Sequence, residues 1–127
     1  MDEIGNANLF DGTNQVPCEN RYGLPKTAIR LREGFLKVPT GVYFSSDFTV
    51  TAWVKIYSIQ NMVRILDFGK GTRSDNIIIS IGFEGSSILT FWIFNEDRHS
   101  FVKSVTSLKL NYWTHVSVVL NGNIARP

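Results

Sequence analysis

The sequence predicts an all-β fold, an antiparallel β-sandwich, from three observations. The chain has 127 residues, enough for one domain with a core of its own. From Thr27 onward, apolar runs are separated by short polar turns that contain glycine. Helical periodicity is nowhere sustained, and β-branched residues dominate these runs. We therefore predict one domain over residues 1–127, with no helix longer than about two turns and with at least seven strands.

Individual strands are predicted where apolar residues recur at every second position. In segment 47–57, five apolar side chains fall on one face, and in segment 112–120 Val116 and Val118 face inward. Segment 27–32 alternates as well, with Ile29 and Leu31 inward. The further strands predicted are 35–39, 63–68, 76–83, 87–95 and 100–105. Residues 1–26 are rich in Asn, Gly and Pro, and they are predicted to be irregular with at most one short strand.

Composition excludes several classes of protein. The longest apolar stretches fall far short of the roughly 18 residues that a membrane span needs, so an integral membrane protein is excluded. Thirteen Lys and Arg residues against eleven Asp and Glu give a net charge of +2 without a basic cluster, which argues against nucleic-acid binding. Cys18 is the single cysteine and has no partner for an intrachain disulfide.

The predicted strands 76–83 and 87–95 are apolar on both faces, and one of these faces needs a cover. Two interpretations stay open. Loops or further chain cover the second face, or it is a platform for sugar rings or for a protein partner. For the second interpretation, the candidate ligand-binding residues are Trp92 with Ile88 and Phe94.

Four segments, in order along the chain, carry the motifs of known modules. DEIGNAN at 2–8 is similar to a D-x-x-G-N-x-N opening, and RYGLPKTA at 21–28 is similar to the R-x-G-x-P-x-S-A segment that follows it. DFTVTAWVK at 47–55 and YWTHVSVVLNG at 112–122 resemble two signature strands. Together they resemble laminin G-like and pentraxin-like domains of the concanavalin A-like lectin/glucanase superfamily, which implies a jelly-roll sandwich in which Trp53 and Trp113 pack.

The chain departs from this resemblance in two ways. Pentraxins join their signature strands by a disulfide, and Thr51 and Ser117 stand at the corresponding positions, which favours a general laminin G-like module. In these families further strands follow the Asn121-Gly122 turn, whereas this sequence ends at Pro127. We therefore expect a jelly roll that is incomplete at its C-terminus, and further polypeptide or a neighbouring chain that completes the sandwich.

Catalysis is not predicted. Glycoside hydrolases of the superfamily cut with two carboxylates, often from a Glu-x-Asp-x-Glu pattern on one strand, and no such pattern occurs here. Glu96 and Asp97 are neighbours, and Glu84 stands alone. His99 and His115 lack a nucleophile motif nearby, and with one cysteine they form no zinc ligand set.

Calcium is the candidate cofactor. The polar segment 70–76 leads into a predicted strand and ends in Asp75-Asn76. By resemblance to the pentraxin loop, whose Asp-Asn pair binds calcium through side-chain oxygens, Asp75 and Asn76 are the predicted metal ligands. Asp67 and Asp97 are further candidates for the rim. The alternative is an ordinary Asp-Asn turn before a strand.

The resemblance implies a non-enzymatic recognition module, extracellular or at the cell surface, of the carbohydrate-binding or cell-adhesion type. Its partner would be a glycan or an extracellular protein. The alternative is a structural or packing subunit of a larger assembly, with no soluble ligand of its own. The sequence does not separate these two functions.

Overall fold

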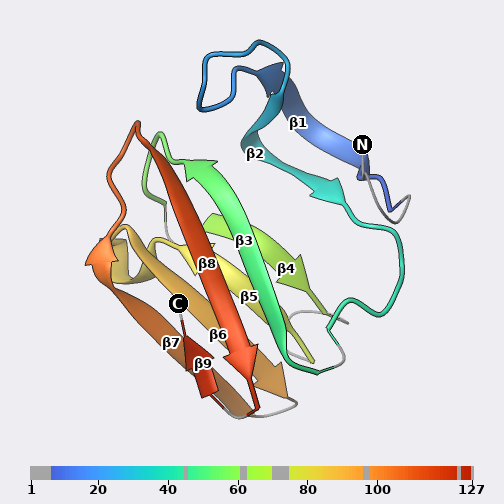
Figure 1. Ribbon diagram of the computed structural model, residues 1–127, viewed down its shortest axis with the longest axis vertical. Helices are drawn as coiled ribbons and strands as arrows, with labels where there is room; N and C mark the ends of the chain where they lie inside the picture. Colours follow the sequence, from blue (N-terminus) through green and yellow to red (C-terminus); the bar gives the residue numbers. More distant parts are fainter. Residues whose placement is uncertain are drawn as a thin grey trace. The chain divides into compact units, whose positions relative to one another are not determined.

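The computed structural model describes residues 7–44, 46–60, 63–69, 75–95, 98–122 and, for the backbone, 124–126. These residues contain nine β-strands and one short 3-10 helix, which confirms the predicted all-β class (Figure 1). The chain divides into two compact units, Met1–Ser45 and Ser46–Pro127, and each is described by itself. The single domain expected over residues 1–127 stays a prediction.

The first unit is a two-stranded antiparallel hairpin of β1 (Phe10–Cys18) and β2 (Ala28–Lys37). Three expectations were wrong here. The segment before residue 27 contains a nine-residue strand, segments 27–32 and 35–39 form one continuous strand, and Ile29 and Leu31 are 51% and 45% exposed rather than inward. None of the described residues of this unit is fully buried.

The break expected near residue 33 is a distortion within the ladder. Pairing shifts register twice between Phe10 and Gln15, and Asn14 and Glu33 both have left-handed φ angles, 49° and 50°. Asn14 Nδ2 donates to the Glu33 carbonyl at 3.2 Å. The strand therefore continues through the irregularity instead of ending there.

The second unit contains two antiparallel sheets. One has the order β3-β8-β9, with β3 at Phe48–Lys55, β8 at Trp113–Asn121 and β9 at Ile124–Arg126. The other has the order β4-β5-β6-β7, with β4 at Val63–Phe68, β5 at Ile77–Ile81, β6 at Ile88–Asn95 and β7 at Arg98–Ser107. The 3-10 helix η1 (Phe83–Gly85) joins β5 to β6. The signature segments thus form the paired strands β3 and β8, and Thr51 lies opposite Ser117 as the resemblance implies.

The core of this unit lies between the two sheets. Its buried residues come from β5, β6, β8 and the loop after β7, and the inward residues of β3 pack against them. Phe48 of β3 meets Phe91 of β6 edge to face, with 6.1 Å between ring centroids. The buried core consists of Ile79, Ile81, Leu89, Phe91, Leu108, Val116 and Val118. Alternation in the sequence therefore identified the inward faces of these strands correctly.

Turns set the ends of the strands. β5 ends at Ile81, earlier than predicted, because Gly82 has a φ of 98° and begins η1. Gly122, with a φ of 57°, lies in the hairpin turn between β8 and β9, and its N–H donates to Asp47 Oδ1 at 2.6 Å. The predicted Asn121-Gly122 hairpin is thus confirmed. In the described part of the chain, no helix is long and apolar enough to cross a membrane.

Candidate functional site

The outer face of the β4–β7 sheet, opposite the core, carries an aromatic cluster. Strand pairing places Trp92 of β6 beside Phe101 of β7, and Phe94 beside His99. Phe83 reaches the same face from η1. The aromatic cluster consists of Phe83, Trp92, Phe94, His99 and Phe101. Because these positions alternate along β6 and β7, their side chains share one face of the sheet.

Ring contacts connect the whole cluster. The Trp92 and Phe101 centroids lie 4.7 Å apart, and Phe83 contacts Trp92 at 5.5 Å and Phe101 at 5.9 Å. At the other end, Phe94 stacks on His99 at 5.7 Å. Separations of this size are typical of favourable aromatic pairs. The result is one continuous aromatic surface over two strands and a turn.

The cluster differs from the predicted ligand-binding set of Trp92, Phe94 and Ile88. Trp92 lies at its centre but is only 7% exposed, while Phe101 beside it is 47% exposed. Phe94 belongs to the cluster, whereas Ile88 lies opposite Ser107 near the other end of β6. The surface available to a ligand is therefore mainly that of Phe101 and its exposed neighbour His99.

Sequence reasoning missed Phe83, His99 and Phe101. His99, Phe101 and Lys103 alternate along β7, and that spacing is a usable signal. Lys103 Nζ lies 4.6 Å from the Phe83 ring centroid, a cation–π geometry at the edge of the cluster. Phe83 follows the end of β5, and its return onto the sheet depends on the left-handed Gly82.

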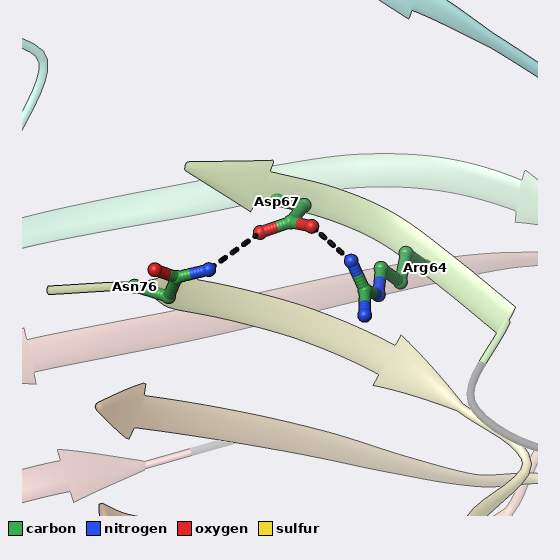
Figure 2. A network of polar contacts seen from close by, with 3 residues as sticks. All are labelled: Arg64, Asp67 and Asn76. Carbon is green, nitrogen blue, oxygen red and sulfur yellow. Dashed lines mark hydrogen bonds and ion pairs between the residues drawn. The ribbon is translucent and has the colours of Figure 1, made fainter. Parts of the chain in front are cut away.

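Polar side chains continue the outer face onto β4 and β5. Asn76 Nδ2 donates to Asp67 Oδ1 at 3.4 Å, and Asp67 Oδ2 pairs with Arg64 (Figure 2). Asn76 is buried, and its amide packs directly against Gly69, where a Cβ atom would overlap it. Trp92 Nε1 donates to Ser80 Oγ at 3.1 Å between β6 and β5.

The predicted calcium ligands Asp75 and Asn76 differ in their surroundings. Asp75 is exposed and has a left-handed φ of 51°, whereas Asn76 is buried and contacts Asp67. Carboxylate and amide oxygens are the right donor types for calcium, but the Arg64 guanidinium already neutralises Asp67. Among the described residues, no group of three or more His, Cys, Asp and Glu side chains could hold a metal ion. The contacts present fit a polar network better than a complete calcium site.

The remaining candidates are dispersed. His115 lies on the outer face of the other sheet, where its ring is 5.1 Å from that of Trp53. Trp53 is 46% exposed, which is more than the packing role implied by the resemblance would give. Glu84 is exposed within η1, and Glu96 and Asp97 lie outside the described residues.

Comparison with protein families gives one match. The model described as the concanavalin A-like lectin/glucanases superfamily, a laminin G model, matches residues 32–126, which is more than half of the chain. Comparisons with curated proteins and with solved structures gave no match.

Proposed function

Because this chain belongs to the concanavalin A-like lectin/glucanases superfamily, we propose that it is a non-enzymatic recognition module that binds a saccharide at the aromatic cluster. The observation that carries the proposal is the aromatic cluster on the outer face of the β4–β7 sheet. A sugar ring has an apolar face of C–H groups that stacks on aromatic rings, and Phe101 with its 47% exposure offers such a ring.

The burial of Trp92 supports the proposal in a second way. Trp92 contacts Phe83, Phe94, His99 and Phe101, and its indole N–H is held by Ser80. A residue fixed on so many sides keeps the exposed rings around it in place. Pre-positioned rings lose little conformational entropy when a ligand binds. We further propose, from the family, that the module acts outside the cell in carbohydrate binding or adhesion.

A second candidate function is that of a packing subunit in a larger assembly. The apolar side chains of the β1–β2 hairpin favour it, since Ile29 and Leu31 are exposed at alternating positions of β2. Exposed apolar residues that gather on one element are typical of surfaces that associate with other proteins.

Binding of defined glycans on an array, measured with and without calcium, tests the leading proposal. The parent chain should bind a subset of saccharides, and Phe101→Ala should lose that binding with its fold intact. Val105→Ala is the matched control, because Val105 is a fully exposed apolar residue on the same strand but outside the cluster. Absence of glycan binding by the parent, together with tight association with a protein, would support the packing subunit instead.

Calcium assistance is a separate proposal with its own test. If Asp75 and Asn76 form part of a calcium site, added Ca²⁺ raises the melting temperature, because a ligand that binds only the folded state stabilises it. Asp75→Ala should abolish that rise. A melting temperature of the parent that does not respond to calcium would leave the pair as a turn before β5.

A further inference from the structure

A row of four polar residues crosses the outer face of the β4–β7 sheet beside the aromatic cluster. Strand pairing sets Arg64 opposite Ser80, Ser80 opposite Thr90, and Thr90 opposite Lys103. These four residues are named the polar row. The neighbouring row, two residues further along β5 and β6, contains Ile78, Trp92 and Phe101. Hydroxyl and cationic groups therefore lie directly next to the aromatic rings.

The two hydroxyls in the middle of the polar row are fully buried but differ in their bonding. Ser80 Oγ accepts the hydrogen bond from Trp92 Nε1. Thr90 Oγ1 has no hydrogen-bond partner among the described residues, although Thr90 is 0% exposed. Buried hydroxyls in folded proteins nearly always have a partner, so an exception calls for an explanation.

Phe83 contacts two neighbours of Thr90 on this face. Its ring contacts Trp92, two residues along β6 from Thr90, and it also contacts Lys103, which faces Thr90 from β7. The hydrogen bonds of Ser86 to the Phe83 carbonyl lie within the turn and do not join it to the sheet. Gly82, Glu84 and Gly85 all have left-handed φ angles, an arrangement without the regular hydrogen-bond ladder of the strands. The turn is fixed at its end by the two hydrogen bonds between Ser87 and Leu108, whereas Phe83 contacts the sheet through its side chain.

We propose that the polar row is the hydrogen-bonding half of the saccharide site, and that Thr90 Oγ1 bonds a ligand hydroxyl once Phe83 has moved off the sheet. This inference rests on the proposed function. The sugar ring stacks on Phe101, and its hydroxyls reach Thr90 and Lys103 at the edge of that ring. Thr90 lacks a partner in the free protein because its partner belongs to the ligand.

Replacement of Thr90 separates this role from a role in folding. Thr90→Val keeps the shape of the side chain and removes only the hydroxyl, so the melting temperature of the free protein should stay the same or rise. The saccharide that gives the highest array signal with the parent is then titrated by calorimetry, and its affinity should fall about tenfold for Thr90→Val. Thr90→Ser should retain most of the affinity. Thr51→Val, at an exposed position of the other sheet, should leave it unchanged.

Phe83→Ala tests, through the association rate constant of the saccharide, whether the Phe83 ring has to move before the ligand binds. Removal of the ring should raise the association rate constant of the same saccharide, because binding no longer waits for Phe83 to move. Phe83→Leu should give a smaller increase if the alanine variant proves unstable. If the parent and Thr90→Val bind the saccharide with equal affinity, this inference is overturned and the proposed function stands. If the parent binds no saccharide, both are overturned. Unchanged association rates in both Phe83 variants would overturn the proposed movement of Phe83.

Discussion

The two faces of the β5–β6 pair are equally buried yet chemically different. The inner face carries Ile79, Ile81, Leu89 and Phe91, all packed against the opposite sheet. The outer face carries Ser80 and Thr90 at the same degree of burial as Phe91, next to the buried Ile78 and Trp92. Close packing over hydroxyl groups does not build a stable core in the way that aliphatic packing does. Equal burial therefore fits a folding role on one face and, on the other, the recognition role that we propose.

The largest expected effect lies on the inner face. Phe91→Ala removes a core ring and leaves a cavity, so the free energy of unfolding should fall by about 3–5 kcal/mol in urea titration. Phe101→Ala on the outer face removes the same side chain from a half-exposed position, so the free energy of unfolding should fall much less than for Phe91→Ala. Equal losses for the two variants would contradict the difference between the faces.

The second effect tests how the outer face is assembled near β4. A Cβ atom at Gly69 would overlap the Asn76 side chain, so Gly69→Ala should lower the free energy of unfolding by about 1–3 kcal/mol. Asn76→Ala makes room for that atom. The Gly69→Ala change should therefore cost clearly less when it is introduced into Asn76→Ala, and additive losses would show that the overlap is not the cause.

The third effect measures the bonded hydroxyl of the outer face. Ser80→Ala leaves the buried Trp92 N–H without its acceptor and should cost about 1–3 kcal/mol in thermal unfolding. A double-mutant cycle with Trp92→Phe isolates the pair. A coupling energy near zero would mean that this hydrogen bond does not stabilise the fold.

The smallest effect concerns the ion pair at the rim of the outer face. Arg64 and Asp67 are both partly exposed, so Arg64→Gln should cost less than about 1 kcal/mol. In 1 M salt the Debye length falls to about 3 Å, which screens the ion pair. The loss of unfolding free energy caused by Arg64→Gln should therefore be smaller still. A larger loss that salt does not change would place this pair among the residues that hold the sheet together.

Sequence periodicity predicted most strands of the second unit because most of them bury one face at alternating positions. Segment 63–68 corresponds to β4 residue for residue, and the family resemblance paired β3 with β8 correctly. Periodicity failed for β1, whose Gly, Asn and Pro residues are tied to β2 by backbone pairing and not by a buried face. For the site, Trp92 and Phe94 were found on the apolar second face of their strand. Phe83 was missed because its position depends on a turn. Phe101 was missed because the alternation along β7 does not by itself show that this strand pairs with β6.

The register shift between Arg64 and Leu66 has a consequence for changes in chain length. Ile65 and Leu66 are consecutive, yet both pack against the core, so Arg64 and Asp67 share the outer face although three positions separate them. Loss of Ile65 would pair Arg64 and Leu66 with consecutive residues of β5, so the side chains beyond the shift would keep their faces. The Asp67 carboxylate would stay on the outer face beside Arg64. The extra residue of this strand therefore adds one apolar side chain to the core and leaves the polar face unchanged.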